Sequence, residues 1–172
     1  MRCSLRPRRF RSGQTTVEFA LIYASVLLPL TVGLIYISEL LWVWHSVVDF
    51  TRQGAGYAAT HCWESSAANV VGFMRANVPL MPDRDQFQNG PAQIGVTYYA
   101  VDPSSGALSP FGCDTDCSIS CIPDEVTVTV SGYQFGYFVA YLGLPPVPLP
   151  NFQTTQPIES GGCDPEQGTC LP

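Results

Sequence analysis

The stretch "RRFRSGQTTVEFALIYASVLLPLTVGLIYI", residues 8–37, sets a cluster of arginines directly against a long apolar run. From Phe19 to Ser38, twenty consecutive residues carry no charge, which is enough for an α-helix to cross the hydrocarbon core of a bilayer. One acidic residue, Glu18, lies immediately before this uncharged run. An ionised carboxylate at such a position is expensive unless it is paired or hydrated. Glu18 therefore needs a partner, and the nature of that partner bears on function.

Charge is distributed unevenly on the two sides of the apolar run. Five of the eight arginines precede Gly13, and the chain contains no lysine. Beyond Gly13, three arginines stand against fourteen acidic residues, a net charge of −11. The positive-inside rule therefore predicts a single-pass protein with a cytoplasmic N-terminus and an extracytoplasmic C-terminal domain. Such an acidic domain repels phosphate backbones, which argues against a nucleic-acid partner.

A removable secretory signal is the alternative interpretation of this N-terminus. The apolar core of such a signal runs for about 7–15 residues and ends at a small-residue cleavage site. Here the apolar character continues through "ELLWVWHSVVDF", residues 39–50, and the first candidate site comes only at Tyr57. The pattern favours a helix that is retained.

Beyond the span, the apolar pattern predicts that the same helix continues to about residue 60. Val43, Val47, Phe50 and Tyr57 recur at roughly helical spacing. Pro29 is expected to kink this helix rather than end it. Trp42 and Trp44 suit the membrane–water interface.

The remainder of the chain predicts a small α+β domain. A second amphipathic helix is expected over about residues 64–77, and alternating apolar and polar residues predict strands within 92–102 and 125–135. A third strand is expected within 151–160, at a sheet edge because prolines precede it. The predicted organisation is a basic leader at 1–13, a long helix at 14–60 with its membrane span at about 19–38, and an extracytoplasmic α+β domain at 61–172. The sheet is expected to be antiparallel.

Six of the seven cysteines fall in the extracytoplasmic domain, and Cys3 falls in the leader. An even number in a small exported domain predicts disulfides, here three, among Cys62, Cys113, Cys117, Cys121, Cys163 and Cys170. Six cysteines allow fifteen connectivities. The preferred one joins Cys163 to Cys170, pairs two members of the 113/117/121 triplet and links its third member to Cys62. The alternative, a zinc or iron–sulfur site, is disfavoured because CxxxCxxxC spacing departs from the usual CxxC pairs.

No catalytic motif accompanies the two histidines, His45 and His61. Neither is embedded in a nucleophile elbow or a comparable sequence context. We therefore predict no enzyme activity, no cofactor and no metal site.

The junction between leader and apolar run carries the most specific signal. Gly13 is followed by "QTTVEF", which puts Glu18 fifth and Phe19 sixth after the glycine. This resembles the class III signal of type IV pilin-like proteins. "GQTTVEFAL" at 13–21 and "SELLWVWHSVVDFTRQGAGYAA" at 38–59 together resemble the TadE family of minor pilins, or pseudopilins, of tight-adherence (Flp-type) pilus systems. The cysteine-rich insert and the "GLPPVPLP" run depart from that family.

The resemblance implies a processing step and an assembly role. A membrane prepilin peptidase would cut between Gly13 and Gln14 and leave Phe19 at the start of a retained helix. The new α-amino group of Gln14 would then offer Glu18 a positive partner, in the same subunit or in a neighbour, and pairing across subunits would fix axial register.

The resemblance also implies a function in the inner membrane. The protein would be a structural subunit that helps to initiate, tip or prime a thin adhesive pilus. Its partners would be prepilin peptidase, other pilin-like subunits and the pilus assembly platform. It would act as a fibre subunit on the surface, as a cap or as an assembly factor in the membrane. The competing hypothesis is a signal-anchored extracytoplasmic binding module or enzyme that is not processed, and N-terminal sequencing separates the two.

Overall fold

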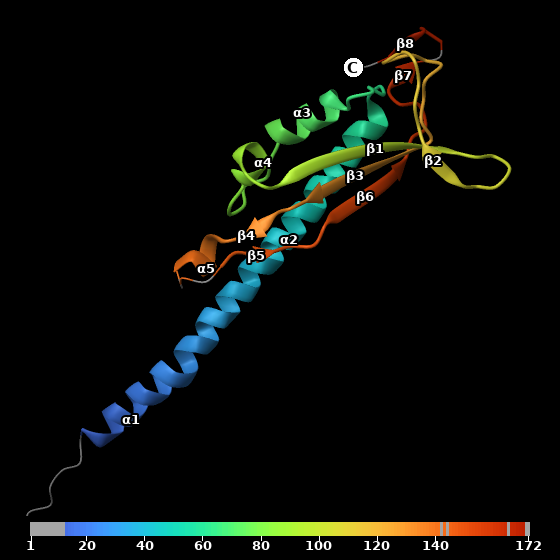
Figure 1. Cartoon of the computed structure of the whole chain (residues 1–172). Coiled ribbons are helices and arrows are strands. Elements are labelled where there is room, and N and C mark those ends of the chain that lie inside the picture. Colours follow the sequence, from blue (N-terminus) through green and yellow to red (C-terminus); the bar gives the residue numbers. More distant parts are fainter. Residues whose placement is uncertain (1–12, 142, 144, 165, 171–172) are drawn as a thin grey trace, which may run out of the picture. The chain divides into compact units, whose positions relative to one another are not determined.

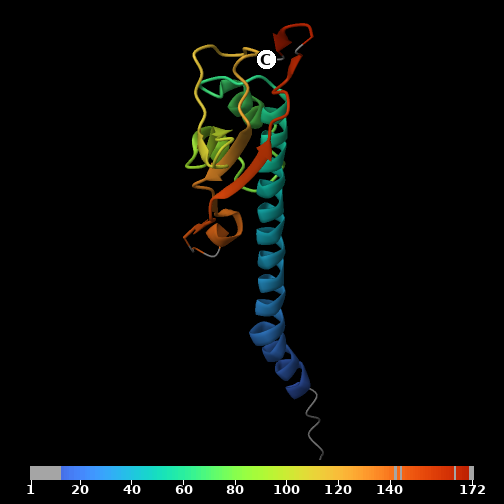
Figure 2. The same cartoon turned by 90° about the vertical axis from the view of Figure 1, so that its right-hand side faces the viewer.

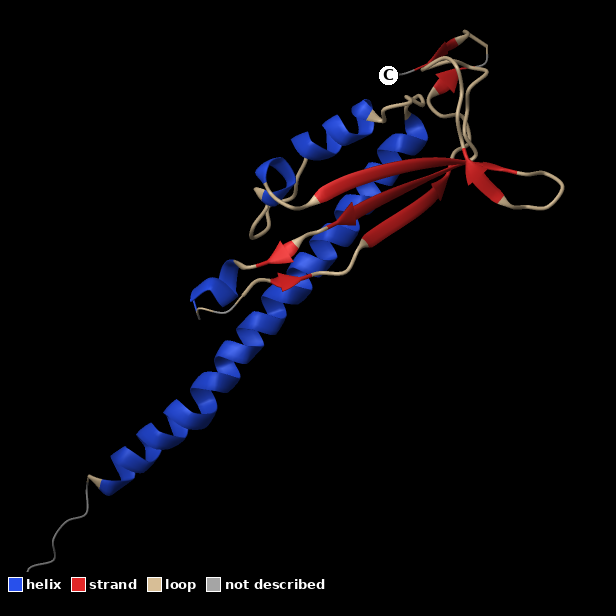
Figure 3. Cartoon of the chain, viewed as in Figure 1, coloured by secondary structure: helices blue, strands red, loops and turns tan. Residues whose placement is uncertain are grey.

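The computed structural model describes residues 13–141, 143, 145–164 and 166–170, and it confirms the expected α+β class (Figures 1 and 3). Most of the leader, with Cys3, lies outside the described residues. The chain divides into two compact units, Met1–Leu40 and Leu41–Pro172. We call the second unit the head. The division falls inside the long helix, whereas the sequence pattern placed it after residue 60, because residues 41–60 pack with the rest of the head.

The N-terminal helix consists of three consecutive segments. They are α1 (Gln14–Ile22), a π-helical turn η1 (Tyr23–Leu27) and α2 (Leu28–Thr60). In η1 the amide of Leu28 donates to the carbonyl of Tyr23, five residues back. Pro29 follows directly; it has no N–H, and its ring crowds the carbonyl four residues earlier, so a wider turn accommodates it. The helix changes direction in this part and continues, as expected for Pro29 (Figure 2).

The head is built on a four-stranded antiparallel sheet in the order β2-β1-β3-β6. Its strands are β1 (Gln93–Val101), β2 (Leu108–Pro110), β3 (Glu125–Ser131) and β6 (Phe152–Pro157). The two strands expected from alternation are present at the centre, and the third expected strand, β6, lies at an edge as predicted. On β3, Val126, Val128 and Val130 are fully buried and alternate with half-buried polar residues. One face of the sheet therefore forms the core.

The C-terminal half of α2 covers this apolar face. Its buried residues follow a helical stripe with spacings of three, four and one: Val43, Val47, Phe50, Thr51, Gly54, Ala55 and Ala58. The hydroxyl of buried Thr51 lies 2.9 Å from that of Thr154 on β6, which links the helix to the sheet edge. Figures 1 and 3 show α2 crossing the sheet on this side.

A second helix, α3 (Ala68–Ala76), packs beside α2. An added Cβ on Gly54 would collide with the sulfur of Met74, which is fully buried. The small residues of α2 thus permit a close approach of the two helices. The helix starts later than the expected residue 64 because Ala67 adopts a left-handed backbone, φ 48°, which α-helical continuation does not allow.

Several short elements complete the head. They are α4 (Gln86–Asn89), β4 (Gln134–Phe135), α5 (Tyr137–Tyr141), β5 (Val147–Pro148), β7 (Cys163–Asp164) and β8 (Thr169–Cys170). Strand β4 pairs with β5, and β7 pairs with β8, each as a two-stranded ribbon. Periodicity did not predict these elements, because none is long enough to display a period.

Three disulfides join the cysteines of the head. They link Cys62 to Cys117, Cys113 to Cys121 and Cys163 to Cys170. This is the pairing preferred from the sequence. The Cys62–Cys117 bond ties the end of α2 to the long loop between β2 and β3, and the amide of Cys117 also donates to the carbonyl of Trp63.

Candidate functional site

The first candidate site is the junction at Gly13. This glycine caps α1 with ordinary right-handed dihedrals, φ −91° and ψ −18°, and its carbonyl accepts from the amide of Val17 at 3.3 Å. A Cβ added at Gly13 would meet nothing within 4 Å. Neither the backbone nor packing therefore requires glycine here. A requirement for glycine at this position would have to come from a molecule that recognises the junction.

The side chains of Gln14 and Glu18 meet on one face of α1. The Gln14 amide Nε2 donates to Glu18 Oε1 at 3.1 Å, as their i, i+4 spacing allows. Both side chains are exposed. Glu18 thus has a neutral donor on its own helix, and within the described residues no cation pairs with it.

Phe19 contributes to an apolar surface that surrounds the first unit. Its ring is 65% exposed and stacks on Tyr23 with centroids 6.4 Å apart. No residue of α1 or η1 is buried. An apolar surface of this extent on a folded chain marks a contact with lipid or with other proteins.

One helix of the described chain, Gln14–Thr60, is long and apolar enough to cross a membrane, with a mean hydropathy of 2.1 in its most apolar window. Its exposed apolar side chains run from Val17 to Trp44. Trp42 stays half exposed, whereas Trp44 packs edge-on against Phe152 of β6, with ring centroids 4.8 Å apart. The helix is therefore suited to single-pass anchoring.

The residues weighed for catalysis or metal binding have structural roles or lie exposed. Cys113, Cys117 and Cys121 are all consumed by disulfides. The ring of His61 stacks on Tyr57, with centroids 3.6 Å apart, and its Nδ1 donates to the Tyr57 carbonyl at 2.9 Å. His45 lies exposed on α2. In the part of the chain that the structure describes, no three His, Cys, Asp or Glu side chains gather as metal ligands would.

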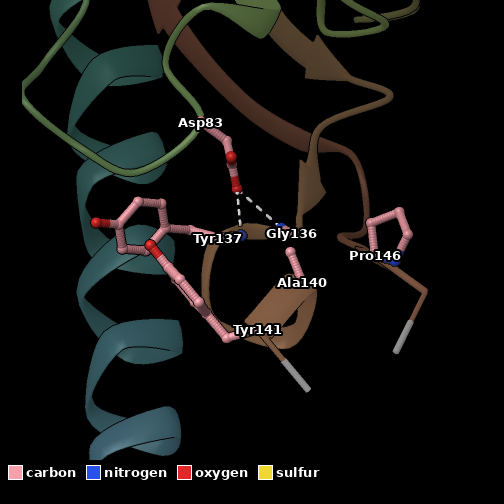
Figure 4. A pocket seen from close by; sticks show the side chains of 6 residues that line it. All are labelled: Asp83, Gly136, Tyr137, Ala140, Tyr141 and Pro146. Atoms are coloured by element: carbon pink, nitrogen blue, oxygen red, sulfur yellow. Dashed lines mark hydrogen bonds between the residues drawn. The ribbon is translucent and has the colours of Figure 1, made fainter. Parts of the chain in front are cut away.

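A pocket that the sequence did not reveal lies beside α5 (Figure 4). It has a volume of about 450 Å³ and is lined by Asp83, Gly136, Tyr137, Ala140, Tyr141 and Pro146. Asp83 Oδ2 accepts from the amides of Gly136 and Tyr137, each at 2.8 Å, as the dashed lines show. The carboxylate that lines the pocket is thus engaged in holding the start of α5.

The loop before α4, which contributes Asp83 to the pocket lining, is held by hydrogen bonds to residues 133 and 134. The buried Tyr133 hydroxyl donates to the Pro82 carbonyl. Burial, and then the nearby Asp83 carboxylate, raise the pKa of Tyr133 well above its usual value. The Gln86 side chain both donates to and accepts from the backbone of Gln134. These groups hold the loop in place.

The comparison with known families bears out the resemblance over the N-terminal quarter of the chain. The model of the TadE-like protein family matches residues 13–56. The match begins at Gly13 and includes the buried residues of α2 from Val43 to Ala55, but not Ala58. No curated protein and no solved structure matches the chain. The similarity to TadE-like proteins points to involvement in a Tad pilus, whose TadE-like components are structural.

Proposed function

We propose that the protein is a minor pilin or pseudopilin that takes part in assembling a Tad-type adhesive pilus from the inner membrane. The observation that carries this proposal is where the family match begins. The TadE-like segment starts at Gly13, one residue before the exposed apolar helix starts. This is the place where a prepilin peptidase would separate the leader from a retained helix.

Processing comes first in the proposed sequence of events. The peptidase cuts between Gly13 and Gln14 on the cytoplasmic side, and the helix stays in the membrane. The head faces the extracytoplasmic space, where its three disulfides can form and persist. This orientation follows from the arginines of the leader and the acidic head.

Assembly then depends on Glu18 and Phe19. Cleavage gives Gln14 an α-ammonium group at the positive end of α1, and the Glu18 carboxylate lies one turn onward. In a bundle of parallel helices, the ammonium group of one subunit pairs with Glu18 of its neighbour. That ion pair offsets the cost of placing the carboxylate in an apolar bundle and selects one axial register. Phe19 adds apolar contact area beside the pair.

N-terminal sequencing of the protein extracted from membranes tests this proposal. A mature chain that starts at Gln14 supports it. An intact Met1 overturns it and favours the second hypothesis, an unprocessed signal anchor that carries a binding module. The pocket beside α5 is the observation that favours the second hypothesis, because a binding module needs a concave surface on its head that can hold a ligand.

The place of the protein in the pilus system requires a second experiment. Immunogold labelling with antibodies against the head should mark sheared pili if the protein enters the fibre. Label confined to membranes would assign it to the assembly platform.

A further inference from the structure

The three arginines of the head differ in whether they form an ion pair. The head has three arginines against twelve acidic residues, a net charge of −9. Arg52 pairs with Asp49 on α2, with Nη1 and Oδ1 3.5 Å apart. Arg75 and Arg84 are exposed, and neither has an ion-pair or hydrogen-bonding side-chain partner among the described residues. Two guanidinium groups in a strongly acidic unit are thus left available.

These two arginines line one pocket. It has a volume of about 190 Å³ and is formed by Arg75, Ala76, Val78, Arg84, Asp85 and Gln88. Asp85 lies in the same lining but pairs with neither guanidinium group. The space suits a carboxylate, which a guanidinium group can bind through two parallel hydrogen bonds.

The backbone segments that carry the two arginines are anchored to the buried core. Arg75 belongs to the last turn of α3, directly after the fully buried Met74. Arg84 follows Asp83, whose left-handed backbone, φ 56°, turns the chain into α4. Phe87 of α4 is buried beneath this turn. The backbone that carries both arginines is therefore held by the core.

The other end of α3 is acidic. Cys62 and Cys117 are joined shortly before α3 begins, and the neighbouring segments 101–125 and 158–170 contain eight acidic residues and no arginine or lysine. Figure 1 places β7 and β8, which lie at this disulfide-bonded end, away from α4. Three of its exposed carboxylates, Asp114, Glu159 and Glu166, have no side-chain partner within the described chain.

We propose that the pocket of Arg75 and Arg84 binds exposed carboxylates from the disulfide-bonded end of a second copy of this chain. Heads with a net charge of −9 repel one another everywhere except where a local cation meets the approaching acid. The contact joins two different surfaces, so it is head-to-tail and can extend into an open filament rather than close into a dimer. This inference rests on the proposed function, because exposed ion pairs are weak and require copies concentrated in a membrane or fibre.

Site-specific photo-crosslinking in the full chain tests the contact. A photoreactive amino acid replaces Gln88, which lines the pocket, and cells are irradiated with the protein in its own membrane. The expected product is a crosslinked pair in which the second copy is attached through residues 113–121 or 158–170. The charge reversals Arg75→Glu and Arg84→Glu together should lower its yield about tenfold, as expected for the loss of two exposed ion pairs.

Two controls make the result specific. Arg52→Glu reverses the third arginine of the head, which lies outside the pocket, and should leave the yield unchanged. A second copy carrying Asp114→Arg, Glu159→Arg and Glu166→Arg should restore crosslinking to the Arg75→Glu, Arg84→Glu chain. Intact disulfides, measured by non-reducing mass spectrometry, verify that each variant folds.

Either of two results would overturn the contact. One is an undiminished yield in the double variant, and the other is attachment to a different protein or to another part of the second copy. Processing at Gly13 is measured in the same strains. Normal processing combined with an undiminished yield removes this inference and leaves the proposed function standing, whereas an intact Met1 removes the proposed function itself.

Discussion

Residues 13–40 and the head use apolar side chains in opposite ways. In the first unit, residues such as Phe19, Leu30 and Leu34 remain more than half exposed. In the head, α2 concentrates its apolar residues in one stripe and buries them against the sheet. The sequence of α2 changes accordingly, from apolar on all sides before Ser38 to apolar on one side after Leu41. The first pattern needs an environment outside the chain, and the second needs only the chain.

This difference separates two kinds of residue. A substitution in the first unit should leave the stability of the head intact and act on processing or assembly. A substitution in the core of the head should act on the free energy of unfolding. The following predictions test that separation, beginning with the largest effect.

Gly13→Trp should abolish processing. The fold does not need glycine at this position, so the loss would fall on recognition at the junction. The uncut form should migrate about 1.4 kDa heavier, at roughly 110 Da for each of the leader residues. Gly33→Ala is the matched control, because a Cβ there also meets nothing within 4 Å. Immunoblotting of membranes measures both, and normal cutting of Gly13→Trp would refute the assignment of the junction.

Glu18→Ala should spare membrane insertion and strongly reduce piliation. Removing a carboxylate lowers the cost of insertion for the monomer, so any loss must arise when subunits meet. Gln14→Ala removes the donor that reaches Glu18 at 3.1 Å but keeps the carboxylate. This control should assemble if the essential partner is an amine. Counting pili by electron microscopy decides, and wild-type piliation by Glu18→Ala would remove the electrostatic argument.

Loss of the Cys62–Cys117 bond should be the largest single destabilisation of the head. Chain entropy predicts a loss of about 4 kcal/mol for a bond that closes a separation of 55 residues. The same model predicts about 2 kcal/mol for the Cys163–Cys170 bond, which spans 7. Denaturant unfolding of Cys62→Ala, Cys117→Ala chains against Cys163→Ala, Cys170→Ala chains compares them. Equal losses would mean that strain or residual structure outweighs loop length.

Gly54→Ala should destabilise the head by about 1–3 kcal/mol, the range for overpacking a well-filled core. The new methyl group would press on the buried sulfur of Met74. Gly72→Ala, on the open side of α3, meets nothing within 4 Å and should instead stabilise by up to about 1 kcal/mol. Thermal unfolding followed by near-UV circular dichroism measures both. If Gly54→Ala were neutral, α2 and α3 would not be in close contact.

Tyr98→Phe should have the smallest effect at neutral pH. The buried Tyr98 hydroxyl has no hydrogen-bond partner within the described chain, so its removal should change the free energy of unfolding by less than about 1 kcal/mol.

The same hydroxyl makes stability depend on alkaline pH. Burial, and then the Glu64 carboxylate, raise the pKa of Tyr98 from 10.0 to about 12. The folded head therefore holds this proton more tightly than the unfolded chain does, and stability falls as pH rises from about 10 to 12. Tyr98→Phe should reduce that fall, and an unchanged profile would assign it to other groups.

The sequence predicted the helices and strands that show a regular apolar period. It did not predict features that depend on the backbone of a single residue or on very short segments. Alternation in "EVTVTVS" was sufficient to place β3, and the spacing of Val43, Val47 and Phe50 identified the buried stripe of α2. The start of α3 depends on the backbone of Ala67 alone, which no periodic pattern encodes. The elements α5, β4 and β5 are too short to display one.

The candidate sites divide in the same way. Gly13 and Glu18 were proposed from the sequence because their local spacing resembles the class III signal and the apolar run beside them is long. Arg75 and Arg84 were not linked by the sequence, because their shared pocket depends on the turn at Asp83 and on the packing of α4. The only sequence signal for this pocket was the scarcity of arginines in an acidic head, and counting charges does not show that two of them lie close together.

The π-turn before Pro29 has a mechanical consequence. In an α-helix under tension, each turn resists extension through its i→i−4 hydrogen bonds. At η1 those bonds are replaced by a wider pattern, and Pro29 contributes no donor at all. A force applied along the helix axis should therefore extend the helix first between Tyr23 and Pro29. A helix pulled at its two ends should lengthen there first and recoil when the load is released.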